Sequence, residues 1–353
     1  MLDNPPSGVR YMLYDPDHFR RIRKLAESTW VPGRLARRIY WLARYNRLVD
    51  KALVHVSNYW DYSLIRMRRR FVADTENVGT FISGWRFEDL HSPHIRRAIE
   101  KSIRSKYCKK IMPLTCAARR TMEAVFNLQG VEEKIEVVYP AIRPLEADIR
   151  EHDHETRILF VGNDFLIKGG RELLEAFRVI DGKYDAKLVI VSQEAYRNLR
   201  PGRNIEVFPY IPRKELLSKF YSNADIFCLP TYADSFAFVF LEAKAAGLPI
   251  ISTTHFHVPE IVEDWKSGLL IKAPISCWKS NLTFDIGWYD RLRNSRFPEA
   301  VSELAEKLSI LIEDTSLRRK MGNEGRREVM EGRFSMEVRN RKLKEIYTEA
   351  ANK

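Results

Sequence analysis

Two acidic residues lie eight positions apart, Asp234 and Glu242, in the segment DSFAFVFLEAKAAGLP. Asp234 follows an apolar run that predicts a buried strand, and Glu242 falls within the helix predicted at residues 238–246. Carboxylates at a strand end can accept hydrogen bonds from sugar hydroxyls, and the free N–H groups at a helix start can bind phosphate oxygens. The spacing alone is weak evidence, because a solvated helix face gives the same pattern. The strand–loop–helix context favours a ligand site.

The second half of the chain alternates short apolar runs with helical patterns, which is typical of a parallel α/β sheet with helices on both faces. The predicted strands span residues 157–162, 187–191, 205–208, 225–229, 249–252 and 268–271. The predicted helices between them span residues 170–180, 213–221 and 238–246. Ligands of such sheets bind beyond the carboxyl ends of the strands, so we expect the chemistry in the loops after Val161, Leu229 and Ser252.

The first half predicts a smaller α/β domain, with strands at residues 52–56, 70–73, 109–114 and 135–139. A length of 353 residues favours two domains. The charged stretch 143–156, which contains Pro144, predicts the linker, so we divide the chain into domains 1–148 and 149–353. Residues 273–298 show no clear periodicity and predict a functional or mobile loop. Three helices, at residues 299–313, 316–331 and 336–350, are expected to close the chain.

The positive charge of the chain is concentrated in its first half. The net charge is +12, of which residues 1–150 contribute +11 (28 Lys and Arg against 17 Asp and Glu) and the remainder +1 (31 against 30). This asymmetry indicates contact with phospholipid headgroups, a phosphorylated acceptor or nucleic acid. A generally basic proteome is the alternative.

A helix predicted at residues 33–49 carries much of this charge. Its basic face lies beside two aromatic residues, and both a lipid interface and a core-packed helix with a solvated basic face fit the pattern. The residues of that face are Arg34, Arg37, Arg38 and Arg44, with Trp41 and Tyr45 at its side.

Other patterns argue against secretion, membrane spans and metal sites. The four cysteines, Cys108, Cys116, Cys228 and Cys277, form no C-x-x-C pair, so neither a disulfide framework nor a zinc site is expected. No apolar run reaches about 18 residues, and the N-terminus has no apolar signal region, which together predict a cytoplasmic protein. The D-x-D at residues 15–17 is interpreted as a turn and helix cap, and the H-D-H at residues 152–154 as solvated.

Several motifs, taken in order along about two hundred residues, resemble glycosyltransferase family 4 and its glycosyl transferases group 1 domain. Asp234 and Glu242 take the two acidic positions of the E-x7-E motif of that family. The other matching segments are FVGNDFLIKGG at residues 160–170, PEIV at 259–262, GLL at 268–270, FS at 334–335 and IY at 346–347.

The resemblance implies a GT-B fold, in which two Rossmann-like domains face each other across a cleft, here with a shortened N-terminal domain and a C-terminal helix that crosses back. It also implies a retaining hexosyltransferase that uses a nucleotide-sugar donor and needs neither a metal nor a cofactor. Glu242 would bind the ribose hydroxyls, Asp234 a hydroxyl of the donor sugar, and Lys168 the diphosphate. The remaining donor-binding residues would be Gly162, Asn163, Ser235, Phe236, Ala237 and Phe238, with Tyr210 and Ile211 bordering the base or only packing in a loop.

The chain departs from the family pattern at several positions. Asn163 replaces an arginine that contacts phosphate, the first acid is Asp234 instead of Glu, and Ala237 stands at a glycine position. The family's Gly-Gly before PEIV is replaced by HFH at residues 255–257, and its glycine-rich loop near the N-terminus has no counterpart. Either of His255 and His257 could supply a phosphate contact, or each is a surface histidine.

These observations lead to one interpretation and two alternatives. We expect a glycosyltransferase whose acceptor is membrane-associated, lipid-linked or otherwise anionic, acting in the cytoplasm or at the inner face of the membrane. The first alternative is a GT-B-like sugar-nucleotide epimerase. The second is a non-catalytic protein that binds anionic surfaces on the same fold, with nucleic acid the less favoured partner.

Overall fold

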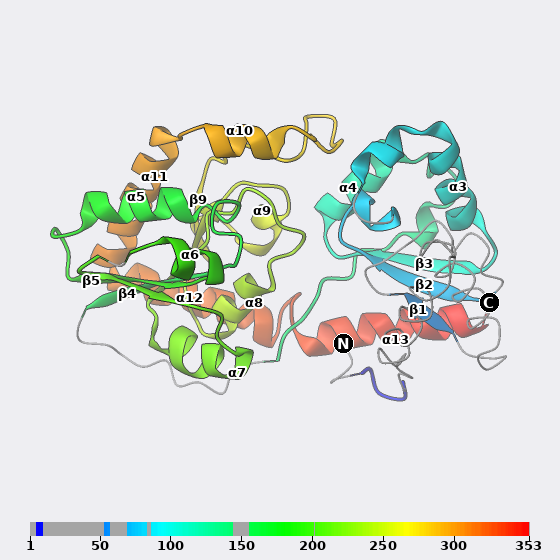
Figure 1. Ribbon diagram of the computed structural model, residues 1–353. Helices are drawn as coiled ribbons and strands as arrows, with labels where there is room; N and C mark the ends of the chain where they lie inside the picture. Colours follow the sequence, from blue (N-terminus) through cyan, green and yellow to red (C-terminus); the bar gives the residue numbers. More distant parts are fainter. Residues whose placement is uncertain are drawn as a thin grey trace, which may run out of the picture. The chain divides into compact units, whose positions relative to one another are not determined.

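The computed structural model describes residues 5–9, 53–56, 69–82, 86–143, 155–200 and 202–352 (Figure 1). The chain divides into two compact units. The first comprises Met1–Leu114, Ala118–Val138 and Asn340–Lys353, and the second Thr115–Ala117 and Tyr139–Arg339. The domain boundary expected at residue 148, the basic helix at 33–49, and the motifs at 15–17 and 152–154 lie outside the described residues.

A six-stranded parallel sheet forms the centre of the second unit, in the order β6-β5-β4-β7-β8-β9. The strands are β4 (Thr156–Val161), β5 (Ala186–Val191), β6 (Ile205–Phe208), β7 (Ile226–Cys228), β8 (Ile250–Thr253) and β9 (Gly268–Ile271). All six agree with the prediction to within one residue at each end. The order reverses between β4 and β7, which is where sheets of this type bind ligands.

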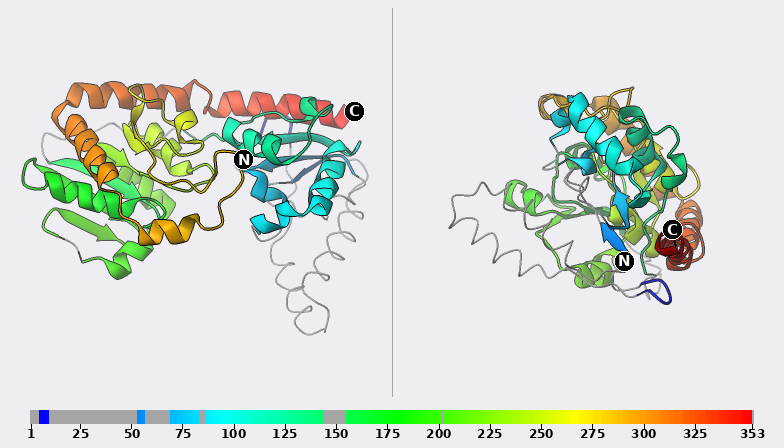
Figure 2. Two further views of the ribbon diagram at one scale, coloured as in Figure 1. Left: turned by 90° about the horizontal axis from the view of Figure 1, so that it is seen from above. Right: turned by 90° about the vertical axis from the view of Figure 1, so that its right-hand side faces the viewer.

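Helices connect and follow the strands of this sheet, and several of them lie side by side although they are far apart in the sequence. They are α5 (Gly170–Ile180), α6 (Gln193–Asn198), α7 (Arg213–Glu215), α8 (Phe238–Ala245), α9 (Val258–Ile261), α10 (Trp288–Asn294), α11 (Pro298–Glu313) and α12 (Thr315–Met330). A π-helical turn, Leu216–Phe220, and a 3-10 turn, Tyr221–Asn223, continue α7. Helix α11 packs beside α5, and α12 packs against α8 (Figure 2). Within the described ranges, no helix has both the length and the apolar character that crossing a bilayer requires.

Helices α8 and α12 approach each other closely. A Cβ atom on Gly322 of α12 would lie 1.9 Å from the carbonyl oxygen of Gly247, so only glycine fits there. The fully buried Lys244 of α8 forms an ion pair with Glu328 of α12 and donates to Ser267 Oγ at 3.1 Å. Burial lowers the pKa of Lys244 despite the Glu328 carboxylate. These contacts fix α8, which carries Glu242, against the body of the unit.

The segment 273–298, predicted to lack regular structure, is more ordered than expected. An antiparallel bridge joins Trp278 and Phe284, and Trp278 stacks on Phe256 with ring centroids 5.0 Å apart. Helix α10 occupies residues 288–294. The sequence prediction missed this helix because only Trp288 and Leu292 of its seven residues are buried, too few for a visible apolar period.

The first unit contains a three-stranded parallel sheet, β1 (Val54–Val56), β2 (Phe71–Thr75) and β3 (Cys108–Pro113). Its helices are α3 (Pro93–Arg104), α4 (Cys116–Val125) and most of α13 (Met336–Asn352), and its 3-10 turns are Val78–Phe81, Phe87–His91 and Glu132–Lys134. The strand expected at residues 135–139 is instead an isolated bridge between Ile135 and Ile111.

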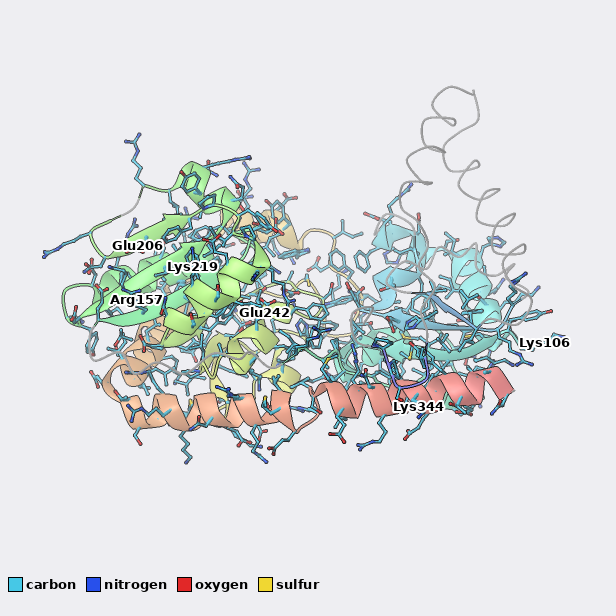
Figure 3. The ribbon with its side chains drawn as sticks, turned by 90° about the horizontal axis from the view of Figure 1, so that it is seen from below. Lys106, Arg157, Glu206, Lys219, Glu242 and Lys344 are labelled. Atoms are coloured by element: carbon cyan, nitrogen blue, oxygen red, sulfur yellow. The ribbon has the colours of Figure 1, made fainter. Side chains whose placement is uncertain are left out.

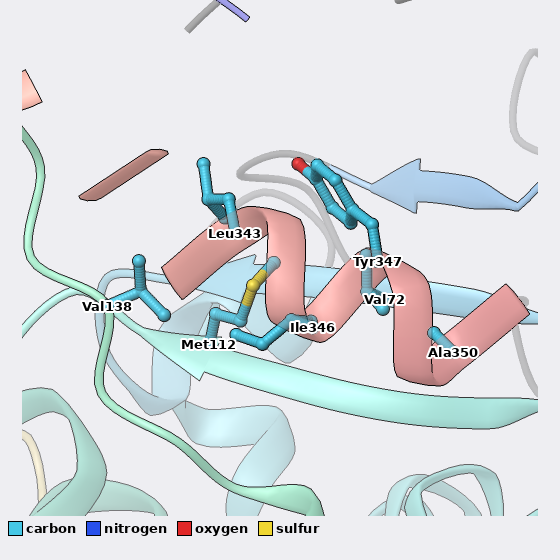
Figure 4. Packing of buried hydrophobic residues seen from close by; sticks show 7 residues of the cluster. All are labelled: Val72, Met112, Val138, Leu343, Ile346, Tyr347 and Ala350. Atoms are coloured by element: carbon cyan, nitrogen blue, oxygen red, sulfur yellow. The ribbon is translucent and has the colours of Figure 1, made fainter. Parts of the chain in front are cut away.

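Helix α13 supplies one side of the core of this unit (Figure 4). Its apolar residues recur at helical spacing and face side chains of β2, β3 and the segment after them. The cluster consists of Val72, Met112, Val138, Leu343, Ile346, Tyr347 and Ala350. The hydroxyl of Tyr347 also lies 2.6 Å from Nδ1 of His55, whose Nε2 lies 3.1 Å from Asp74 Oδ2.

Candidate functional site

The loops after β4 and β7 meet at the point where the strand order reverses. Gly169, at the end of the β4 loop, has a φ of 70°, and a Cβ atom there would lie 2.2 Å from the carbonyl oxygen of Pro230. The amide of Tyr232 donates to the carbonyl of Ile167 at 2.9 Å. Gly169 therefore permits a close backbone approach that places the preceding residue, Lys168, beside the β7 loop.

Lys168 and Asp234 form an ion pair across these two loops. The Lys168 Nζ atom lies 2.5 Å from Asp234 Oδ2 and 2.9 Å from the carbonyl oxygen of Ala233. The aliphatic part of Lys168 lies over Gly162, where a Cβ atom would be 3.1 Å from Lys168 Cγ. These two contacts use two of the three N–H donors of the ammonium group. Asn163, next to Gly162, is exposed.

The second carboxylate oxygen of Asp234 caps its own loop. Asp234 Oδ1 accepts hydrogen bonds from the amides of Phe236 at 3.2 Å and Ala237 at 2.8 Å, which a side chain as short as Asp can reach. Burial opposes ionisation of Asp234, but the Lys168 charge and the Ala237 amide together hold its pKa below the usual value. Asp234 is thus held by the Lys168 ammonium and by backbone amides, and groups of both kinds commonly bind anions in proteins.

Glu242 lies on α8 and is held from two directions. Its Oε1 accepts a hydrogen bond from Arg213 Nε at 2.7 Å, and the buried Tyr221, whose hydroxyl donates to the Val239 carbonyl oxygen at 3.4 Å, lies near its carboxylate. Burial, together with the Glu242 charge, raises the pKa of Tyr221 well above its usual value. Figure 3 shows Glu242 next to the helical stretch that carries Lys219. The predicted site omitted Arg213 and Tyr221, although Arg213 directly follows the loop that contains Tyr210 and Ile211.

A family model described as glycosyl transferases group 1 matches residues 143–278, the segment that contains all of these residues. Residues 143–278 are therefore similar to a glycosyl transferases group 1 domain. This confirms the resemblance inferred from the motifs.

Individual proteins agree with this assignment. A Haemophilus influenzae protein described as an uncharacterized glycosyltransferase is 29% identical over 225 residues, which is 62% of this chain and 60% of that protein. Two further curated relatives are covered to 46% and 44%, so the chain spans about half the length of the curated relatives it matches.

Solved structures share the fold. Sucrose-phosphate synthase from Thermosynechococcus elongatus has a TM-score of 0.63 at 16% identity, covering 98% of this chain and 82% of that one. Anabaena Alr3699/HepE in complex with UDP-glucose has a TM-score of 0.56 at 14% identity, covering 80% and 72%. The GT-B fold class predicted from the sequence is confirmed.

The other predicted residues of the glycosyl transferases group 1 domain differ in exposure. Tyr210 is 66% exposed, so its ring does not pack in the core, and its amide lies 3.4 Å from Gln193 Oε1. Ile211 and Ser235 are half-buried, Phe236 is buried, and Phe238 is 51% exposed. Their contacts with a nucleotide sugar stay predictions.

Both histidines of the HFH segment are buried, so their interpretation as surface residues is wrong. His257 is completely buried and stacks on Phe236, with centroids 6.2 Å apart and planes 12° apart. His255 Nε2 lies 3.7 Å from Cys277 Sγ. Burial lowers the pKa of His255 to about 3 and of His257 to about 4, which keeps both rings neutral at neutral pH. Through Phe236, His257 thus packs against the loop that follows Asp234.

Ala237 and Phe256 stand where the family has glycine, and both keep a backbone conformation that favours glycine. Ala237 has a φ of 54° and Phe256 a φ of 48°. This left-handed conformation costs a residue with a Cβ atom about 1–2 kcal/mol. The two strained residues flank Phe236 and His257, which indicates that the surrounding contacts hold both loops in place.

Replacing Ala237 with glycine should stabilise the domain. Glycine relieves the left-handed strain, and after its greater entropy in the unfolded chain is subtracted, we expect the free energy of unfolding to rise by about 0.5–1 kcal/mol. Ala245→Gly, in the helical backbone of α8, is the matched control and should lower it by about 1 kcal/mol. Denaturant unfolding measures both, and an equal decrease in the two variants would contradict the strain assigned to Ala237.

The buried histidines should make stability fall as the pH decreases. Their pKa values in the fold lie below the unfolded value of about 6.5, so their contribution is complete above pH 6.5 and is lost as the pH falls toward 4. His257→Gln should reduce the loss of unfolding free energy between pH 6.5 and 4.5 by on the order of 2 kcal/mol. His94→Gln, at an exposed position of α3, is the control and should show the same loss of unfolding free energy as the wild type. A His257→Gln curve parallel to that of the wild type would contradict this account.

Proposed function

We propose that the chain transfers a sugar from a nucleotide-sugar donor to an acceptor with retention of anomeric configuration. The observation that carries the proposal is the meeting of Lys168 and Asp234 at the switch point between β4 and β7. Open α/β sheets bind their ligands at this point. The glycosyl transferases group 1 match covers both residues and supports the same reaction class.

The chemistry follows from the charges gathered there. Breaking the bond between the donor sugar and the diphosphate leaves negative charge on the departing oxygen, which a fixed cation stabilises. Lys168 has a third N–H donor for that oxygen, and the amides at the start of α8 can add to it. Asp234 holds Lys168 in place and faces the donor sugar. Catalysis then rests on placement and charge stabilisation, with no protein nucleophile and no metal ion required.

A nucleoside diphosphate sugar is the donor class that this arrangement suits. Alr3699/HepE, which shares the fold, has been solved in complex with UDP-glucose. In this chain, the buried carboxylate of Glu242 provides acceptors for the ribose, and the exposed Tyr210 ring provides a surface for the base.

A donor screen tests the proposal and separates it from the alternatives. UDP-, GDP- and ADP-sugars would be incubated with the protein and candidate acceptors, and products identified by NMR, with and without EDTA. We expect a metal-independent glycoside product that keeps the donor's anomeric configuration. A changed sugar nucleotide or free sugar formed without an acceptor would instead indicate an epimerase, and absence of turnover would favour a non-catalytic binding protein.

The acceptor is proposed to be anionic and membrane-associated. Residues 1–150 carry a net charge of +11. In a GT-B enzyme the N-terminal half is the acceptor side, so this charge would draw the protein to a lipid-linked acceptor at the inner face of the membrane.

Liposome binding tests this placement. The wild-type protein should sediment with anionic liposomes at low salt, where electrostatic attraction is least screened. Replacing Arg34, Arg37, Arg38 and Arg44 with Gln should reduce sedimentation and leave donor hydrolysis unchanged. Wild-type protein that ignored the liposomes would rule out the membrane and leave a soluble acidic acceptor.

Glu242→Ala should weaken nucleotide binding. It removes hydrogen bonds from ribose hydroxyls to a charged acceptor, each worth about 1.5–3 kcal/mol. Glu215→Ala, on α7, removes an exposed carboxylate that pairs with Lys219 and should change little. Calorimetry with nucleoside diphosphates measures both, and an unchanged affinity in folded Glu242→Ala protein would remove Glu242 from the site.

Lys168→Ala should reduce turnover more than it weakens nucleoside binding. The lost cation stabilises the departing diphosphate, so kcat should fall about a hundredfold. Lys187→Ala is the matched control, because Lys187 is also ion-paired but lies at the amino end of β5, where it contacts Glu155 and Glu206. If both variants lost the same activity, the assignment of Lys168 would be wrong.

A further inference from the structure

One hydrogen bond connects two parts of the proposed nucleotide site that the sequence left separate. Arg213 is the first residue of α7 and directly follows the loop of Tyr210 and Ile211, which is expected to border the base. Its Nε donates to Oε1 of Glu242 on α8 at 2.7 Å. The hydrogen bond therefore links the end of the loop expected to border the base to the carboxylate expected to bind the ribose.

The two partners differ sharply in exposure. The Glu242 side chain is 8% exposed, whereas that of Arg213 is 63% exposed. A carboxylate withdrawn from water is unfavourable unless it is paired, so Arg213 matters more to Glu242 than an ordinary surface ion pair would. Because the guanidinium is planar and donates through Nε, it fixes the orientation of the carboxylate as well as its charge.

Glu242 is also supported from within the unit. Tyr221 is completely buried and stacks on Phe227 of β7, with centroids 5.6 Å apart and planes 21° apart. Phe227 in turn meets Phe240 of α8 edge to face at 6.1 Å. The Tyr221 hydroxyl donates to the carbonyl oxygen of Val239 on α8 at 3.4 Å and is thus rigidly placed near Glu242. Arg213 on the exposed side and Tyr221 on the buried side leave the carboxylate little freedom to rotate.

We propose that Arg213 is a positioning residue that orients Glu242 toward the ribose hydroxyls and thereby sets a preference for ribonucleotides over deoxyribonucleotides. The inference rests on the proposed function, in which Glu242 binds the ribose. A site that hydrogen-bonds a ligand hydroxyl discriminates strongly against the analogue that lacks it, provided that the acceptor is held in place. Arg213 acts through Glu242, so its effect disappears when either Glu242 or the ribose hydroxyl is removed.

A double-mutant cycle tests the inference. The probe is whichever of UDP, GDP and ADP the wild type binds most tightly, together with its 2′-deoxy and 3′-deoxy forms. Calorimetry would give the Kd of each for the wild type, Arg213→Gln, Glu242→Gln, the double variant and Lys214→Gln. Lys214 is the neighbouring exposed cation of α7 and serves as the control.

We expect Arg213→Gln to weaken binding of the ribonucleotide about tenfold and to leave the weaker binding of at least one deoxy form nearly unchanged. The double variant should bind no more weakly than Glu242→Gln, and Lys214→Gln should match the wild type. In the donor reaction, KM should rise and kcat should stay within about twofold. Arg213→Lys keeps the charge without the planar group, so it should recover only part of the lost affinity.

Two results would overturn the inference. The first is a loss of binding free energy in the double variant that equals the sum of the losses in the two single variants. The second is an unchanged preference for ribose over deoxyribose in both Arg213→Gln and Arg213→Lys. The proposed function would survive either result as long as the wild type binds a nucleotide and requires Glu242. A wild type that binds none of the three nucleotides would instead refute the proposed function. Measuring Arg213→Lys as well keeps the test decisive if Arg213→Gln does not fold.

Discussion

The ion pair between Lys168 and Asp234 depends on the strand order of the sheet. Parallel strands β4 and β7 are neighbours, but their connections leave in opposite directions, so only their two loops meet at this edge. Gly169 allows the backbones to touch, and the ammonium then reaches the carboxylate at 2.5 Å. Asp234 also accepts hydrogen bonds from the amides of Phe236 and Ala237. The Lys168 charge, with a smaller contribution from the Ala237 amide, outweighs burial and holds the pKa of Asp234 below its usual value. The other residues of the proposed donor site lie around this ion pair.

The rest of the site is arranged by packing of α8. Lys244 and Gly322 hold that helix against α12, so Glu242 projects from a rigid element. His257 stacks on Phe236, the neighbour of Ala237, whose backbone is left-handed. Lys168, Asp234 and Glu242 are therefore oriented before a ligand arrives. Such preorganisation reduces the free-energy cost of binding.

The sequence predicted the parallel sheet of the second unit closely, because buried parallel strands read as continuous apolar runs. The ordered motifs also singled out Lys168, Asp234 and Glu242; the structure brings Lys168 and Asp234 together, and the roles of all three stay predictions. The sequence prediction missed Arg213, whose partner is 29 residues away and whose exposed position looks ordinary. It misjudged His255 and His257, because burial depends on neighbours such as Cys277 that local pattern does not reveal. Helix α10 was missed because only two of its seven residues are buried, and the strand expected at residues 135–139 is reduced to a single bridge at Ile135.

The central claim is that a nucleotide-sugar diphosphate binds at the edge formed by the β4 and β7 loops. A crystal structure of the protein soaked with the nucleoside diphosphate that it binds most tightly tests this directly. The account predicts phosphate density within hydrogen-bonding distance of Lys168 Nζ and the amides at the start of α8, with the ribose at Glu242. Density for the nucleotide at another place, with the Lys168–Asp234 pair untouched and no ligand near it, would contradict the account.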